Sequence, residues 1–190
     1  MRRTLIVVTA VILGLVSANG PAAAQQRPRG IPDRVMLQPD DLGGAAPGPV
    51  EDGLAWSLLP QPCADTPVPR PVVSRTEAAD LGTRFRIYEN VAWYRRDGAK
   101  AYITELKAQL ARCGAGGDEE GFDPVAEDHL GPDTVLFLGT YDEGDRYVGY
   151  VAAAVGHYVV VVMMSDSYLG AADLTTLNGL ASAAMSRAAA

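Results

Sequence analysis

Two long apolar runs, Tyr147–Val155 and Tyr158–Met164, follow one another in this chain and are separated only by Gly156-His157. So short a connection joins two strands as an antiparallel hairpin, and strands this apolar belong in the buried centre of a sheet. Both faces of Tyr158–Met164 are apolar, which makes this strand part of the scaffold and a poor location for a polar site.

The N-terminus has the organisation of a secretory signal peptide. A basic head precedes an apolar run of 14 residues, Leu5–Ala18, which is shorter than the roughly 20 residues that a membrane-spanning helix needs. Ala22-Ala23-Ala24 supplies the small residues of a cleavage site before Gln25; an uncleaved anchor is the alternative. The sequence thus predicts a signal peptide over 1–24, a flexible linker over 25–35 and one domain over 36–190, secreted or in the cell envelope and without a stable membrane anchor after cleavage.

The net charge argues against nucleic acid as a partner. It is −7 for the whole chain and becomes −9 when Arg2 and Arg3 leave with the signal peptide. A protein this acidic repels a phosphate backbone. The 166 residues that remain after cleavage are enough for one compact domain.

Cys63 and Cys113 are the two cysteines of the chain. In an oxidising compartment they are expected to form a disulfide, and closing the 49 intervening residues stabilises a fold by about 4 kcal/mol in the chain-entropy model. Two free thiols are the alternative. A thiol-redox role would require a Cys-x-x-Cys arrangement, which the sequence lacks.

Hydrophobic periodicity places the other elements. Thr83–Tyr94 alternates between apolar and polar residues, although Glu89 interrupts the apolar row and is expected to mark a bulge or an edge. Apolar residues at helical spacing predict helices over 97–113 and 171–188, and further strands are expected over 54–59 and 134–141. The expected fold is therefore an α+β domain, an antiparallel sheet with two helices packed on one face and one disulfide.

Arg84, Arg86 and Tyr88 are the candidate ligand-binding residues. They lie on the polar side of the strand Thr83–Tyr94, where a sheet face left open by the helices can form a groove. Guanidinium groups there would receive a phosphate, a carboxylate or a sulfated sugar. The alternative is that these arginines simply offset the acidic residues of the protein.

Catalytic and metal-binding patterns are weak. His157 lies at a hairpin tip, His129 lies in a loop, and no Gly-x-Ser-x-Gly turn accompanies either. The acidic loop 118–128 could hold calcium, but its spacing does not match an EF-hand and a solvated loop is the favoured interpretation. No enzymatic activity, no metal and no cofactor are expected.

Scattered residues resemble the PknH-like extracellular sensor domain, which occurs on actinobacterial serine/threonine kinases and in secreted proteins and lipoproteins. The residues that carry the likeness are Asp41-Leu42-Gly43-Gly44, Trp56, Cys63, Tyr94-Arg95-Arg96-Asp97-Gly98-Ala99, Ala111-Arg112-Cys113 and the strand pair Tyr147–Val155 and Tyr158–Met164.

The resemblance implies a non-catalytic α+β domain whose cleft binds an unidentified ligand. The chain departs from the family in having one cysteine pair where two are expected, and in carrying neither a kinase nor a membrane anchor. We therefore expect a secreted, non-catalytic ligand-binding or sensor-like domain of the cell envelope, with a small molecule, a glycan or an envelope protein as its partner. A cell-envelope protein-interaction module is the alternative, and an unrecognised hydrolase is the third possibility.

Overall fold

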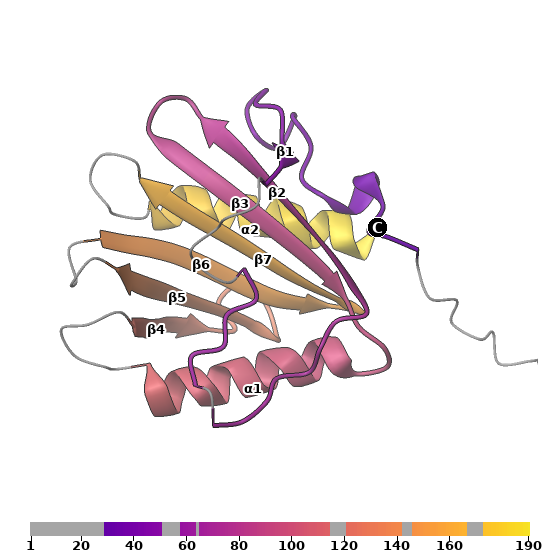
Figure 1. Cartoon of the computed structure of the whole chain (residues 1–190). Helices are drawn as coiled ribbons and strands as arrows, with labels where there is room; N and C mark the ends of the chain where they lie inside the picture. Colours follow the sequence, from indigo (N-terminus) through magenta and orange to yellow (C-terminus); the bar gives the residue numbers. More distant parts are fainter. Residues whose placement is uncertain (1–28, 51–57, 64, 115–120, 142–145, 167–172) are drawn as a thin grey trace, which may run out of the picture.

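The computed structural model describes residues 29–50, 58–63, 65–114, 121–141, 146–166 and 173–190. In this part of the chain one seven-stranded antiparallel sheet carries two α-helices (Figure 1). The order across the sheet is β1-β2-β3-β7-β6-β5-β4. The elements are η1 (a 3-10 turn, Asp33–Val35), β1 (Gly48–Pro49), β2 (Val73–Leu81), β3 (Phe85–Trp93), α1 (Gly98–Cys113), β4 (Gly121–Glu127), β5 (Thr134–Tyr141), β6 (Arg146–Val155), β7 (Tyr158–Asp166) and α2 (Leu174–Ala189).

The β6–β7 hairpin lies at the centre of the sheet, as its apolar sequence predicts. Val155 pairs with Tyr158 across the turn, and Gly156 takes φ = 58°, which glycine adopts without the steric cost that a side chain adds. β7 is the middle strand, between β3 and β6. Each residue from Val159 to Met164 is at most 1% exposed.

The two helices pack on opposite faces of the sheet, whereas the sequence analysis expected them on one face. α2 passes behind β3 and β7 in Figure 1. Alternate residues of β7 contact different layers, because successive side chains of a strand point to opposite faces. One apolar cluster, called the α1 layer here, joins α1 to Val159, Val161 and Met163. A second cluster on the other face, the α2 layer, joins α2 to Val160, Val162 and Met164. The α+β class, the antiparallel sheet and the disulfide are confirmed.

Three strands were not expected from the sequence, namely β1, β2 and β4, and β1 has only two residues, Gly48–Pro49. β2 places Arg75 and Glu77 on the face toward the α2 layer, which hides its alternation, and β4 contains Pro124 with a register shift beside it. The strand expected over 54–59 lies mostly outside the described residues, and residues 58–59 are irregular. Glu89 marks neither a bulge nor an edge, because β3 is an interior strand with continuous pairing to β2 and β7.

The N-terminal part of the domain begins earlier than expected. The expected signal peptide, 1–24, lies outside the described residues. Ile31 and Val35, assigned to the linker by sequence, are buried in the α2 layer. The helices described are too short and too polar to span a membrane.

Cys63 and Cys113 form the expected disulfide, with their Cα atoms 5.9 Å apart. Replacing both by alanine should lower the free energy of unfolding by about 4 kcal/mol, because the unfolded chain regains the freedom of a long loop. Denaturant titration of the wild type and the double variant measures this loss. Two alkylatable thiols in the unreduced native protein would contradict the disulfide.

Candidate functional site

The three residues expected to bind a ligand do not form a common site in the structure. Tyr88 is only 7% exposed and packs in the α1 layer, while the Arg86 guanidinium lies 5.5 Å from its ring centroid and 3.6 Å from Asp80. Arg84 lies instead over the ring of Phe85, at 4.9 Å, and Phe85 packs in the α2 layer. The face of the sheet that was expected to be open carries α1 over β4 to β7, and at β3 Tyr88 is buried in the same apolar cluster while Arg86 stays exposed.

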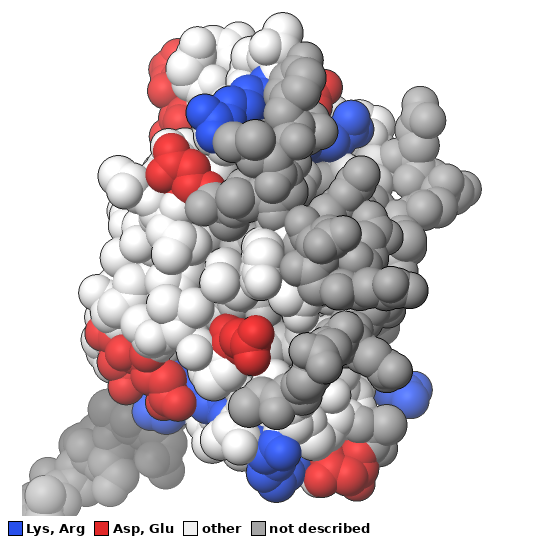
Figure 2. All heavy atoms as spheres, turned by 90° about the vertical axis from the view of Figure 1, so that its left-hand side faces the viewer, with Lys and Arg blue, Asp and Glu red and all other residues white. Residues whose placement is uncertain are grey.

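Charge over the neighbouring surface is mixed. Figure 2 shows acidic and basic side chains interspersed on the described part of the face that it presents, with no broad area of one sign. The ion pair between Arg86 and Asp80 fits the interpretation that the arginines offset acidic residues of the protein. Anion binding at Arg84, Arg86 and Tyr88 stays a prediction.

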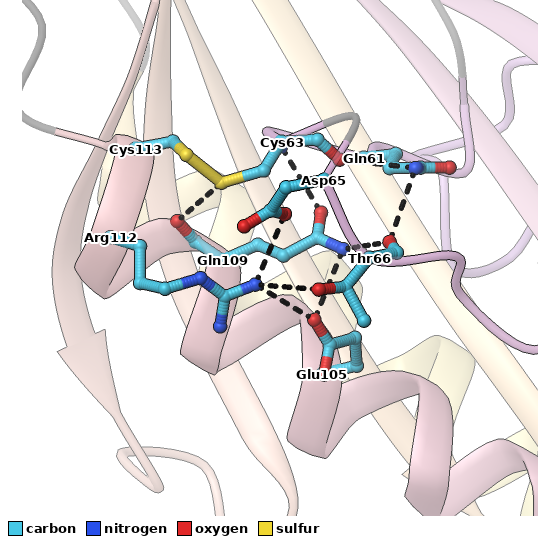
Figure 3. The surroundings of a disulfide bond; sticks show 8 residues. All are labelled: Gln61, Cys63, Asp65, Thr66, Glu105, Gln109, Arg112 and Cys113. Carbon is cyan, nitrogen blue, oxygen red and sulfur yellow. Dashed lines mark hydrogen bonds and ion pairs between the residues drawn. A yellow bond between two sulfur atoms is a disulfide. The ribbon is translucent and has the colours of Figure 1, made fainter.

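A proline-rich segment, residues 58–71 without 64, lies across α1 and is called the strap here (Figure 1). Its first half is fixed to the end of α1 by the disulfide and by Gln109, which is fully buried. The Gln109 Oε1 atom accepts a hydrogen bond from the Cys63 amide at 3.1 Å, and its Nε2 donates to the Thr66 carbonyl at 2.9 Å (Figure 3). Arg112 adds exposed contacts to Asp65 and Thr66.

The strap is also fixed near the start of α1. The Tyr102 hydroxyl donates to the Pro60 carbonyl at 2.8 Å. At the far end, the Val72 amide donates to the Trp93 carbonyl at 2.8 Å, and β2 begins there. The strap is therefore an arch that is held at both ends above the first half of α1.

A cavity of about 300 Å³ lies beneath this arch. It is at the small end of the range of roughly 300–1,000 Å³ that small-molecule pockets span. Residues of the strap line one side, and two tyrosines, one directly after β3 and one from α1, line the other. The lining residues are Leu59, Gln61, Pro67, Val68, Pro69, Arg70, Pro71, Tyr94 and Tyr102.

Tyr94 is held rigidly at the edge of this cavity. Its amide donates to the His157 carbonyl of the β6–β7 turn at 2.8 Å, and its ring centroid lies 5.9 Å from that of Tyr102. The ring also fills the space beside Gly98, where an added Cβ would lie 3.1 Å from the Tyr94 Cβ. A side chain at Gly98, the first residue of α1, would therefore crowd the Tyr94 ring.

The Tyr94 hydroxyl has no hydrogen-bond partner among the described residues although it is buried. Tyr94 as a whole is 1% exposed. A buried hydroxyl without a partner costs about 1–3 kcal/mol, and unpaired groups of this kind occur where a ligand or water completes the bonding. Burial also raises the pKa of Tyr94, so the hydroxyl remains a neutral donor.

Arg70 is the one charged residue among the described residues that line the cavity. It is exposed, and it forms no ion pair with another residue of the described chain. The described lining thus combines apolar side chains with a cation, and the unpaired Tyr94 hydroxyl is buried in a residue beside it. Sequence analysis missed it because Tyr94 and Tyr102 follow the periodicity of core residues, and the strap has no periodicity.

Both histidines contact other residues of the fold. His129 Nε2 lies 3.0 Å from Asn178 Oδ1, and His157 Nδ1 lies 3.1 Å from the Arg96 carbonyl, with its ring 5.8 Å from Trp93. The described part of the loop 118–128 is mostly β4, and Asp128 pairs with Lys107. Within the described ranges no three His, Cys, Asp or Glu side chains are grouped as metal ligands would be.

Glu89 is a second unusual group, on the opposite face of the sheet. It is 4% exposed, one of its carboxyl oxygens accepts a hydrogen bond from the Leu37 amide at 2.8 Å, and the other has no partner among the described residues. Burial raises its pKa to about 7; the Leu37 amide opposes the rise, and the charges of Glu77 and Asp41 add to it. The adjoining cavity of about 10 Å³ has room for about one water molecule, so no substrate fits there.

Two conservative substitutions test the bonding of the tyrosine hydroxyls. Tyr94→Phe should change the free energy of unfolding by less than about 0.5 kcal/mol or raise it, because the lost hydroxyl is unpaired. Tyr102→Phe should lower it by about 1–2 kcal/mol, since the Pro60 carbonyl loses its donor. Equal losses in denaturant titrations of the two variants would show that the Tyr94 hydroxyl is bonded after all.

Glu89 should make stability depend on pH. Its pKa of about 7 in the folded protein exceeds the ordinary value of 4.5, so its favourable contribution is complete below pH 4.5 and is lost as pH rises through 7. Relative to Glu89→Gln, the wild type should lose on the order of 3 kcal/mol of unfolding free energy between pH 4.5 and 8. Glu127→Gln, an exposed change on β4, is the matched control. If the unfolding free energies of the wild type and of Glu89→Gln differ by the same amount at every pH in this range, the expectation is wrong.

No protein-family model, no curated protein and no solved structure matches this chain. The resemblance to PknH-like sensor domains therefore stays a prediction. Function has to be inferred from the cavity and its walls.

Proposed function

We propose that this protein is a secreted, non-catalytic domain that binds a small molecule in the cavity between the strap and Tyr94. The observation that carries the proposal is the cavity of about 300 Å³ between the strap and Tyr94 and Tyr102. The disulfide fits the oxidising compartment into which a signal peptide would direct the chain.

The rigidity of the site supports a binding role. The strap is fixed by a disulfide, by the buried Gln109 and by the Tyr102 hydroxyl. A site whose walls are already ordered loses little conformational entropy when a ligand enters. The cavity is therefore a preformed one, as ligand pockets usually are.

The alternative, a protein-interaction module, has less support from the described surface. Val125 and Tyr147 are the large apolar side chains that stand exposed there, at 47% and 41%, and they form no broad patch of the kind that marks an interface. β4 is an edge strand, but Pro124 and the register shift beside it are features that hinder the pairing of an added strand.

A thermal-shift screen of the purified protein against envelope glycans, lipids and small organic anions tests the proposal. A compound that binds only the folded state raises Tm with its concentration. Val68→Trp, which fills the cavity, should abolish the shift that such a compound produces. Val125→Trp, the same change at an exposed position on β4, should leave the shift unchanged.

Two results would contradict the proposal. If compounds raise Tm of Val68→Trp as much as that of the wild type, they bind elsewhere and the cavity is not the site. If no compound of the screen raises Tm and none perturbs the NMR signals of Val68 or Tyr102, small-molecule binding in the cavity is wrong.

A further inference from the structure

We propose that residues 31–47, called the clasp here, form a pH-sensitive switch that lies closed on the sheet while Glu89 is protonated and opens when Glu89 loses its proton. The clasp contains η1 and packs in the α2 layer, beside the last turn of α2 (Figure 1). The cavity under the strap adjoins the α1 layer on the other face of the sheet. The switch is therefore independent of the proposed function.

Ionisable side chains join the clasp to the rest of the fold. Each backbone-to-backbone hydrogen bond that the clasp makes with described residues lies within the clasp itself. Its polar contacts with other described elements are those of the Leu37 amide with Glu89, of the Ile31 carbonyl and Asp33 with Arg75, and of Asp41 with Arg187. Apolar packing also holds the clasp, but only the polar contacts depend on protonation.

Glu89 lies where a negative charge is unfavourable. It is buried on β3 directly opposite Glu77 of β2, which is also buried, and like charges directly opposite one another destabilise a sheet. One Glu89 oxygen accepts a hydrogen bond from the Leu37 amide, and the other has no partner among the described residues. While the clasp is closed, the charged form of Glu89 is therefore poorly compensated.

The charges around Glu89 do not remove this imbalance. They belong to three parts of the fold and are Arg75 and Glu77 of β2, Asp33, Asp40 and Asp41 of the clasp, and Arg187 of α2. Both arginines already have acidic partners, Glu77 for Arg75 and Asp41 for Arg187. On β7, the residue paired in register with Glu89 is Val162, which carries no charge.

Opening of the clasp would expose Glu89 to water and separate it from the Leu37 amide. Glu89 then has the ordinary pKa of 4.5, whereas burial raises its pKa to about 7 in the closed form. Because the closed form binds the proton more tightly, the stabilisation of closure is complete below pH 4.5 and is lost as the pH rises through 7. Between pH 5.5 and 8 these two values increase the open fraction about 30-fold.

The ion pair of Asp41 and Arg187 does not contribute to this change. Burial would raise the pKa of Asp41, but the bonds from Arg187 and the Gln38 amide lower it overall. The pair therefore stays charged from pH 5.5 to 8, and the pH dependence belongs to Glu89.

Amide hydrogen exchange followed by NMR tests the switch, because it separates local opening from global unfolding. The Val35, Met36 and Leu42 amides donate to carbonyls within the clasp. After correction for the intrinsic pH dependence of exchange, their protection should fall about 30-fold between pH 5.5 and 8. They should also be less protected than the amides of β7, and low urea concentrations should change their protection less, since a local opening exposes less surface.

Three variants assign the effect to Glu89. Glu89→Gln keeps an acceptor for the Leu37 amide but does not titrate, so the fall in protection should disappear. Glu77→Gln removes the charge opposite Glu89 and should move the fall to lower pH, because that charge raises the pKa of Glu89. Glu127→Gln, at an exposed position on β4, is the matched control and should behave like the wild type.

Two results would overturn the inference. If the clasp amides are as strongly protected as those of β7 throughout the pH range, the clasp opens only when the whole domain unfolds. If Glu89→Gln loses protection with pH as the wild type does, another group causes the opening.

Discussion

The need to cover both faces of β7 governs the architecture. Every residue from Val159 to Met164 is apolar and buried, and side chains of a strand alternate between the two faces. One helical layer can remove only half of that surface from water. α1 covers one face, and α2 with the N-terminal residues around η1 covers the other. At roughly 25 cal/mol per Å² of apolar surface, an uncovered face would cost more than a domain of this size can tolerate.

The two layers differ in how closely the outer chain segments pack on them. On the α2 side, the chain around Leu37 and Leu42 packs directly on the strands, and the remaining cavity, about 10 Å³, adjoins Glu89. On the α1 side, the strap lies further out and is joined to the helix by a disulfide and by side-chain hydrogen bonds. Such point attachments hold a segment in place without packing it closely. The larger cavity is found on this side for that reason.

Much of the fold could be predicted from the sequence, because β3 and both helices have apolar periodicity and β6 and β7 are nearly continuous apolar runs. β2 could not, since Arg75 and Glu77 form an ion pair on its inner side, and β4 was concealed by Pro124. The continuous apolar run of β7 already implied cover on both faces, and the expectation of helices on one face overlooked that implication. The choice of Arg84, Arg86 and Tyr88 as candidate ligand-binding residues rested on the same expectation of an open face, and anion binding there stays a prediction.

The cavity itself had no sequence signal. The sequence predicts Tyr94 and Tyr102 as core residues, and both are buried. What distinguishes Tyr94 is that its hydroxyl has no hydrogen-bond partner among the described residues, which depends on where the distant strap lies. Arg70 lies among prolines, where neither helical nor strand periodicity exists to assign its direction. Contacts between a strap and a helix about 40 residues apart follow from tertiary structure, which local patterns do not encode.

The prolines of the strap restrict its backbone hydrogen bonding. Residues 67–71 read Pro-Val-Pro-Arg-Pro, and proline has no N–H. Five carbonyls in this stretch are therefore accompanied by only two amide donors. A backbone of this kind can form a strand ladder along one edge only, because the Val68 and Arg70 amides would point to the same side of an extended chain. The other edge has no donors, which limits how the segment above Tyr94 can join a sheet.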